Sequence, residues 1–454
     1  MISWGTTFGS HDGALAVFED TKLVFASDAE RWSRKKNDSI IPDNLIKFAE
    51  EHWGVPNKVY FYEDIRIKNR RRELAGQKLI TPFEFKYDTI PTEHHYSHAC
   101  YGYYTSSFEN CTVLVIDAIG EWATMTQWKV IYGEFKIIKQ WNYPKSIGLF
   151  YSAMTQSAGW KPNEEEYILM GAAGVNRNST FENYSIIRNL WDNGTNFHRG
   201  IDLTMDKFEI ASATQQVYEE VFDDIISEIE DDNLIVVGGC ALNVSANRLL
   251  YKKFSNVHIP CNPGDGGSAI GCVLARTKTK IDPSPYLGYD VVGKYPVENL
   301  IKELKTNGIA GVISGKAEFG PRALGNRSIL ADPSIINIKD RVNKIKGRDN
   351  FRPFAPMILK EDLTSYFKNN IYSPYMNTTF TALNHTRKMY PGIVHLDGTS
   401  RVQIVETDEH KQLLQEWKQE SGCPMLLNTS LNIKGEPMMD KKNNNMPFEG
   451  MEIF

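Results

Sequence analysis

The chain has 454 residues, of which 41% are hydrophobic and 24% charged, and its formal net charge is −5. This length and composition are typical of a globular protein with two or three domains, and the acidic total excludes a global attraction to nucleic acid. No apolar stretch is long enough to cross a bilayer, no secretory signal is visible at the start, and the cysteines contain no C-x-x-C pair. We therefore expect a cytoplasmic protein of a bacterium or a virus-infected host cell, with no membrane partner and no disulfide framework.

Two similar strand patterns occur in the first third of the chain. Residues 2–8, 14–18 and 23–26 read as three strands, and the first turn, from Gly9 to Gly13, contains His11. A second set of three strands is predicted at 113–117, 124–132 and 135–141. The repeat predicts a duplicated α/β domain, as in the actin-like nucleotide-binding folds.

A histidine pair lies between these strand patterns. If the surrounding segment is helical, His94 and His98 lie one turn apart on the same face. Asp117 ends a buried strand, at the carboxyl end where open α/β sheets bind ligands. Histidine and carboxylate ligands without a nearby cysteine favour Fe, Mn or Mg over structural zinc. By itself, however, an H-x-x-x-H pattern is more often two ordinary histidines than a metal site.

A run of basic residues, 66–72, lies before the histidines. Such runs usually form a solvent-exposed charged face. The less common alternative is that the run binds a polyanionic partner. We also expect helices at 44–52, 147–159 and 214–230 from their apolar periodicity.

Two glycine-rich turns follow. Strand 234–237 leads into Gly238, Gly239 and Asn243 and a helical stretch up to residue 254. A strand followed by a glycine pair and a helix amino terminus can bind an anion or a nucleotide. The alternative is that the two glycines only form a tight strand-to-helix turn. In the next turn, Asp265 is either a second oxygen ligand for the metal or a helix cap.

Residues 281–294 are expected to be a linker, because two prolines and a polar composition interrupt both the helical and the strand pattern of apolar residues. They separate residues 1–280 from residues 295–454, which are unusually rich in cations placed in Gly/Pro turns. Arginines held in such turns are well suited to binding phosphate oxygens. A solvated charged face would mix positive and negative residues and would not need the Gly/Pro turns, so we favour anion binding. The cations singled out in this stretch are Lys316, Arg322, Arg327, Arg341, Lys344, Lys346, Arg348 and Arg352.

Several long motifs resemble the nodulation and antibiotic O-carbamoyltransferase family. They are residues 94–99 (HHYSHA), 318–330 (EFGPRALGNRSIL), 351–356 (FRPFAP), 397–403 (DGTSRVQ) and 427–432 (LNTSLN). The motifs follow the family order and span nearly the whole chain. The resemblance implies an actin-like (ASKHA) carbamoyl-transfer domain with a metal and nucleotide site in residues 1–280. It also implies a YrdC-like α/β domain that forms carbamoyl-adenylate in residues 295–454.

In that family, carbamoyl phosphate and ATP give carbamoyl-adenylate, and an acceptor hydroxyl then takes the carbamoyl group. By resemblance, the metal ligands are His94, His98, Asp117 and Asp265, and the general base is His11. The implied nucleotide contacts are Gly238, Gly239 and Asn243. Lys316, Arg322, Arg327, Arg348 and Arg352 would hold carbamoyl phosphate and the ATP phosphates, with Asn428 and Ser430 lining the same site.

The acceptor stays open, because the chain is shorter than typical family members between residues 174 and 233, close to where an acceptor would sit. The favoured acceptor is a 5-hydroxymethyl pyrimidine in DNA, with 5-hydroxymethylcytosine as the best guess, which the basic run 66–72 would suit. The alternative acceptor is a sugar, an antibiotic or another small molecule. Two other classes remain, namely a threonylcarbamoyl-adenosine tRNA enzyme and a non-catalytic actin-like nucleotide-binding module. A homodimer is also left open.

Overall fold

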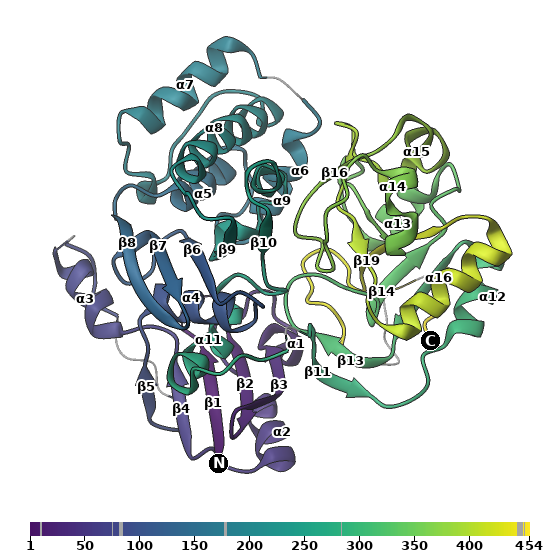
Figure 1. The fold of residues 1–454 in the computed structure, drawn as a ribbon. Helices are drawn as coiled ribbons and strands as arrows, with labels where there is room; N and C mark the ends of the chain where they lie inside the picture. The colour runs from purple at the N-terminus through teal and green to yellow at the C-terminus, as the bar shows by residue number, and fades with distance from the viewer. Residues whose placement is uncertain are drawn as a thin grey trace. The chain divides into compact units, whose positions relative to one another are not determined.

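Figure 1 shows the fold in a computed structural model, which describes residues 1–9, 11–74, 76–80, 85–176, 179–282, 284–442, 448 and 450–454. The chain forms two compact units. The first is Met1–Ser33 with Asn37–Pro285, and the second is Arg34–Lys36 with Tyr286–Phe454. Ser10 of the predicted first turn and Pro283 of the predicted linker lie outside the described residues. Among the described helices, none is both long and apolar enough to span a membrane.

The first unit contains two five-stranded sheets with the same topology. One has the order β3-β2-β1-β4-β5, from Lys22–Asp28, Ala14–Glu19, Ile2–Thr7, Lys58–Phe61 and Thr89–Pro91. The other has the order β8-β7-β6-β9-β10, from Glu134–Asn142, Ala123–Ile131, Asn110–Ile116, Asn233–Val237 and Asn256–His258. In each sheet the central strand is antiparallel to the strand that follows it and parallel to a later strand. The predicted duplicated actin-like α/β fold is therefore confirmed.

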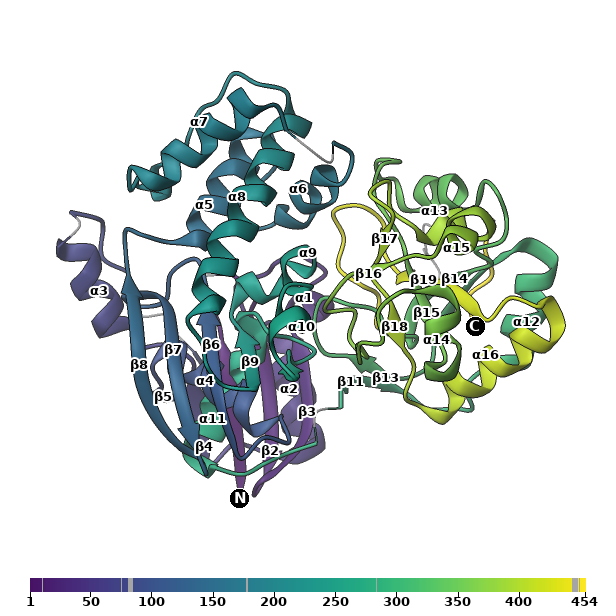
Figure 2. The ribbon, with the colours of Figure 1, turned by 45° about the horizontal axis from the view of Figure 1, so that its top comes forward.

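Two helices form the layer between these sheets (Figures 1 and 2). Helix α11 (Asp265–Thr277) packs on β1, helix α4 (His94–Tyr104) packs on β6 and β9, and the two helices pack on each other. Glycines allow this close approach, since a Cβ on Gly5 would lie 1.7 Å from Ala269 O and one on Gly271 would lie 2.0 Å from Ser97 O. Each helix closes one half of the duplication, so the two helices occupy equivalent places in the repeat.

The remaining helices of the first unit connect strands. Helices α1 (Glu30–Ser33), α2 (Asp43–Trp53) and α3 (Ile65–Leu74) belong to the first half. After β8 come α5 (Ile147–Ser157), α6 (Glu166–Ala173), α7 (Phe181–Asp192), η1 (Phe197–Arg199) and α8 (Lys207–Ser227).

One predicted helix is wrong in extent. The stretch after Gly238 is broken into η2 (Gly239–Leu242), α9 (Val244–Asn247) and α10 (Leu250–Lys253) rather than continuing as one helix to residue 254. The physical cause of the first break is Asn243, whose side-chain Oδ1 accepts a hydrogen bond from Ala246 N at 3.1 Å. An asparagine in this position starts a new helix instead of extending the previous one.

The second unit is built on a five-stranded mixed sheet with the order β12-β14-β19-β15-β18. Its strands are Ile309–Ile313, Arg327–Ala331, Met425–Ser430, Ala355–Ile358 and Gln403–Ile404. Helices α12 (Val297–Asn307) and α16 (Asp408–Ser421) pack together against β12 and β19. The other elements are α13 (Ile338–Lys346), η3 (Lys360–Asp362), α14 (Leu363–Tyr366), α15 (Asn384–Met389), η4 (Pro391–Ile393), and the paired short strands β16 (Phe380–Thr381) and β17 (Thr399–Ser400).

The predicted linker 281–294 needs a correction. Residues 286–291 form strand β11 (Tyr286–Val291), which pairs antiparallel with β13 (Gly315–Glu318). The Tyr286 hydroxyl also donates to Leu324 O at 3.1 Å. These partners are distant in sequence, so the local sequence, with its prolines, could not show that residues 286–291 pair as a strand.

Candidate active site

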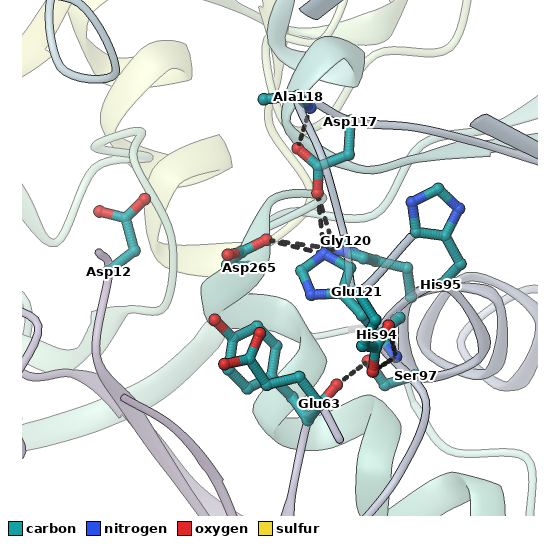
Figure 3. Close-up of polar contacts among 12 residues, drawn as sticks. Asp12, Glu63, His94, His95, Ser97, Asp117, Ala118, Gly120, Glu121 and Asp265 are labelled. Carbon is teal, nitrogen blue, oxygen red and sulfur yellow. Dashed lines mark hydrogen bonds and ion pairs between the residues drawn. The ribbon is translucent and has the colours of Figure 1, made fainter. Parts of the chain in front are cut away.

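Four buried side chains of the first unit converge on one point. His94 Nε2 lies 3.0 Å from Asp117 Oδ2 and 3.5 Å from Asp265 Oδ1. His98 Nε2 lies 3.4 and 3.2 Å from the same two oxygens. One ligand atom from each of these residues lies within 4.8 Å of the others, and Figure 3 shows both carboxylates pointing toward His94. Two imidazole nitrogens with two carboxylate oxygens fit a borderline metal such as Fe or Mn.

The fold explains why these four residues meet. His94 and His98 lie one turn apart on α4, as their spacing predicts. Asp117 directly follows β6, and Asp265 is the first residue of α11. Because α4 and α11 pack on each other, the start of α11 faces the histidine pair.

The four groups compensate one another's charge. Burial alone would lower the pKa of His94, but Asp265 and Asp117 raise it to about 9. Burial alone would raise the pKa of Asp117, but hydrogen bonds from His94 and His98 hold it well below its usual range. Burial likewise opposes ionisation of Asp265, yet its pKa is lowered, chiefly by His94. A cation bound here would replace imidazolium protons, so its binding would release protons.

His11, the predicted general base, lies at the edge of this cluster. Its Nδ1 is 3.0 Å from Asp12 Oδ2, and its Nε2 is 3.9 Å from Asp265 Oδ2. Desolvation alone would lower the pKa of His11, but Asp12 and then Asp265 raise it. A cation held by Asp265 would oppose this effect and favour the neutral imidazole that a base requires.

Glu121 is a residue that sequence reasoning missed. Its Oε1 accepts hydrogen bonds from His94 N and from Asp64 N, each at 2.8 Å. It thereby caps the start of α4, where Glu93 makes no side-chain cap. Burial raises the pKa of Glu121 to about 7. The sequence places Glu121 in a turn near Asp117, but it contains no signal that this turn reaches α4.

The predicted nucleotide contacts lie next to the cluster but have structural partners. Gly238 has a φ of 93°, and a Cβ there would lie 2.2 Å from Ile116 O. A Cβ on Gly239 would lie 3.1 Å from Asp117 Oδ1. The Asn243 side chain caps α9 and exchanges two hydrogen bonds with Gln215, at 3.1 and 3.2 Å. Gly238 N donates to Pro263 O at 2.8 Å and Gly238 O accepts from Ala241 N at 3.0 Å, so the Gly238 backbone, like the Asn243 amide, has partners within the protein.

A second cluster, in the second unit, is cationic. Burial and then the charges of Arg322, Arg348 and Arg352 lower the pKa of Arg401 well below its usual range. The charges of three predicted arginines thus act on a fourth, Arg401, which was not predicted as a site residue although its motif was recognised. The positive charges of these four arginines repel one another, and an anionic ligand would offset that repulsion.

Lys346 joins this cluster to the predicted Ser430. Its Nζ donates to Ser430 O, and to Asn432 O and Oδ1 at 2.8 and 3.0 Å. Burial, followed by the charges of Arg348 and Arg352, lowers the pKa of Lys346 well below its usual range. Lys346 was one of the cations named in this stretch but had no assigned contact, and Asn432 belongs to a recognised motif but had no assigned role.

Asn428 lies on β19 and is 2% exposed. Its Nδ2 donates to Ala323 O and to Gln403 Oε1, at 3.1 and 2.7 Å. Its Oδ1 is buried and has no hydrogen-bond partner among the described residues. A buried acceptor left over in this way is suited to a ligand donor.

Two other predicted cations lie differently. The Arg327 side chain is fully buried, and its guanidinium donates to the backbone oxygens of Tyr289, Ser314, Gly315, Asn326 and Asp440 at 2.8 to 3.0 Å. We therefore assign Arg327 a structural role and correct its prediction as a phosphate ligand. Lys316 is exposed on β13, a strand of the separate two-stranded sheet.

The basic run 66–72 does not form a uniform cationic face. Arg66 pairs with Asp64 at 2.7 Å, and Lys68 pairs with Glu63 at 2.8 Å. Arg71 is buried, at 5% exposure, whereas Arg70 is exposed. Much of the positive charge of helix α3 is therefore paired with acidic residues or buried within the protein.

Comparison with known proteins matches both units to one family. The family profile described as carbamoyltransferase C-terminus matches residues 301–450. The profile described as carbamoyltransferase N-terminus matches residues 55–225 and 202–274.

Three relatives align over most of the chain. An uncharacterized protein of Synechocystis sp. is 29% identical, over 94% of this chain and 91% of its own. The nodulation protein NolNO of Sinorhizobium fredii is 26% identical, over 95% and 75%. The 3'-hydroxymethylcephem-O-carbamoyltransferase of Amycolatopsis lactamdurans is 26% identical, over 95% and 93%. A solved structure, the activator of 2-hydroxyisocaproyl-CoA dehydratase from Clostridium difficile, covers 61% of this chain and 95% of its own at 13% identity, with a TM-score of 0.38 that is too low to indicate function.

Proposed function

This chain belongs to the carbamoyltransferase family, and on that premise we propose that it is an ATP-dependent O-carbamoyltransferase that uses carbamoyl phosphate. Water first hydrolyses carbamoyl phosphate to carbamate and phosphate. Carbamate then attacks the α-phosphate of ATP to give carbamoyl-adenylate and pyrophosphate. Finally, an acceptor hydroxyl attacks the carbamoyl carbon, and AMP leaves.

We assign the activation half to the second unit, as a YrdC-like domain. Arg322, Arg348, Arg352 and Arg401 would bind the phosphates of carbamoyl phosphate and ATP, whose negative charges otherwise repel each other. Lys346 would hold Ser430 and Asn432 in place at this site. Lys316 and Asn428 stay proposed contacts, whereas Arg327 is left out.

We assign the transfer half to the first unit. His94, His98, Asp117 and Asp265 would hold a metal ion, which when bound supplies positive charge for the phosphate of the adenylate and the leaving AMP. Gly238, Gly239 and Asn243, which lie next to the cluster, stay proposed nucleotide contacts. His11, at the edge of the cluster, would take the proton of the acceptor hydroxyl as that oxygen attacks.

The observation that carries this proposal is the convergence of His94, His98, Asp117 and Asp265 in a chain whose two units both match the family. Such a site is suited to stabilising a leaving phosphate, which a non-catalytic nucleotide-binding module would not require. A threonylcarbamoyl-adenosine enzyme would in addition consume L-threonine and modify tRNA.

For the acceptor, we now favour a small molecule over DNA. The argument for DNA rested on the basic run, and Arg66, Lys68 and Arg71 are engaged or buried within the protein. One relative that aligns over 93% of its own length is named for a small-molecule acceptor, 3'-hydroxymethylcephem. DNA containing 5-hydroxymethylcytosine is the alternative acceptor to be tested.

The test is mass spectrometry of acceptors incubated with the full chain, ATP, metal and carbamoyl phosphate. The panel contains a hydroxymethylcephem, a sugar, an aminoglycoside and DNA with 5-hydroxymethylcytosine. A gain of one carbamoyl group that requires both ATP and carbamoyl phosphate supports the proposal. If pyrophosphate is not released from ATP when carbamoyl phosphate is added, the proposed reaction is wrong.

A further inference from the structure

Arg71 is a buried cation of the first unit whose charge has no direct counterpart. Its guanidinium makes one long hydrogen bond, from Nη1 to Gly120 O at 3.3 Å, and lies 5.8 Å from the centre of the Tyr143 ring. Among the described residues, no carboxylate lies within ion-pair distance of it. A guanidinium has five N–H donors, so most of its hydrogen-bonding capacity is unused.

The acids nearest to Arg71 are committed elsewhere. Glu63 binds Lys68 through both carboxylate oxygens, at 3.0 and 2.8 Å. Glu121 accepts the backbone N–H groups of Asp64 and His94. Both acids attract Arg71 only at longer range, and burial lowers the pKa of Arg71. A buried charge without an anionic partner is unfavourable, so its presence points to a ligand.

Arg71 lies beside the proposed metal site. Gly120 O accepts its hydrogen bond, and on the other side of the same residue a Cβ would lie 3.1 Å from His94 Cδ2. Figure 3 shows Gly120 next to His94. Gly120 therefore contacts both the guanidinium and a residue of the cluster.

The surroundings of Arg71 are cationic and aromatic. His198 contacts the Tyr143 ring at 6.0 Å between ring centres, and desolvation, then Arg71 and Arg72, lower the pKa of His198. The Tyr143 hydroxyl accepts a hydrogen bond from Asn196 Nδ2 at 2.9 Å. His198 and Asn196 belong to the region between residues 174 and 233, where acceptor selection was expected.

We propose that Arg71 is the anchor of an acceptor subsite, and that it binds a carboxylate or phosphate group carried by the hydroxylated small molecule that receives the carbamoyl group. This inference rests on the proposed transferase function and names its substrate class. The planar guanidinium fits either anion in a two-pronged contact, and Tyr143 supplies an apolar wall beside it.

Binding is measured by titration calorimetry of the metal-loaded full chain with three probes that share a sugar ring: glucose, glucuronate and glucose 6-phosphate. We expect one or both anions to bind more tightly than glucose, and Arg71→Gln to weaken that binding at least about tenfold. The two anions distinguish a carboxylate from a phosphate acceptor. Arg70→Gln, an exposed neighbour on the same helix, is the matched control and should bind like the wild type, and Arg71→Lys should restore part of the affinity.

Equal binding of glucose and both anions, or unchanged binding by Arg71→Gln, overturns the subsite. Thermal unfolding excludes a purely structural role, because a cation kept for a ligand adds little stability to the free protein. Arg71→Gln should unfold at the wild-type temperature or above, and a marked drop relative to Arg70→Gln also overturns the subsite. Carbamoyl phosphate-dependent pyrophosphate release should persist in Arg71→Gln; its absence from the wild type would refute the transferase instead.

Discussion

His98 and Asp265 meet at 3.2 Å, although each belongs to the helix that closes a different half of the duplicated first unit. His98 lies in the first turns of α4, and Asp265 starts α11. The repeat of the fold therefore creates a place where the starts of two equivalent helices face each other. Histidines from one half and carboxylates from the other then complete a four-residue site.

Removal of one carboxylate from this site should abolish metal retention. We expect Asp265→Asn to lower the metal content of dialysed protein at least about tenfold, since an amide is a weaker ligand and leaves His94 and His98 with Asp117 as their one carboxylate in the cluster. Carbamoyl transfer should fall with it, while pyrophosphate release by the second unit should persist. Elemental mass spectrometry measures the metal, and Asp290→Asn, an exposed acid of the second unit, serves as control. Wild-type metal content in Asp265→Asn would contradict the assigned ligand set.

Metal affinity should depend on pH in a defined direction. The pKa of His94 is raised to about 9 in the metal-free protein, so below that pH its imidazole is protonated and must lose a proton to bind metal. We expect affinity to rise by about tenfold per pH unit for each proton released, and to level off near pH 9. Competition with a chelator between pH 6 and 9 measures this slope, and a flat profile would rule out imidazole ligation at this site.

Arg327 and Arg401 should behave oppositely when truncated. Arg327→Met leaves five backbone carbonyls without their buried donor, and we expect it to cost about 3 kcal/mol or more of unfolding free energy. Arg401→Met removes a repulsive charge, so stability should be kept while pyrophosphate release is lost. Urea unfolding and a pyrophosphate assay distinguish the two. A stable, inactive Arg327→Met would return Arg327 to the phosphate-binding set.

Lys346 should be needed for activation of the carbamoyl group. Lys346→Met removes the donor shared by Ser430 and Asn432, and we expect pyrophosphate release to fall about 100-fold or more. Lys344→Met, an exposed lysine on the same helix, is the matched control and should keep full activity. Equal activity of the two variants would show that Lys346 has no part in the site.

The second unit should lose stability in mild acid through His410. Burial lowers the pKa of His410 from 6.5 to about 4, so between these values only the unfolded chain takes up the proton. The neutral, buried His410 contributes on the order of 3 kcal/mol to the free energy of unfolding. This contribution is fully present above pH 6.5 and is lost as the pH falls to 4. Unfolding of wild type and His410→Gln across this range measures the effect; the variant should show a shallower acid loss, and equal slopes would contradict it.

Much of the chemistry was visible in the sequence because it depends on short-range spacing. His94 and His98 are one helical turn apart, and Asp117 follows a strand, so each could be recognised from local pattern alone. The two strand meanders likewise revealed the duplication. Family motifs then connected these residues to Asp265, which in isolation is equally well read as a helix cap.

Long-range partners could not be recognised in this way. Arg327 and Arg322 lie in the same motif and have the same side chain. Arg327 is nevertheless buried and bonded to four carbonyls distant in sequence, whereas the charge of Arg322 acts on Arg401 together with those of Arg348 and Arg352.

The sequence by itself determined the residue types, the repeat and the family, because these depend on local pattern. Only the tertiary structure decided which cations are buried and which protein groups they bind, because hydrogen-bond partners and burial are set by segments that pack together after folding. Glu121, Lys346 and the unpaired Arg71 became functional candidates for that reason.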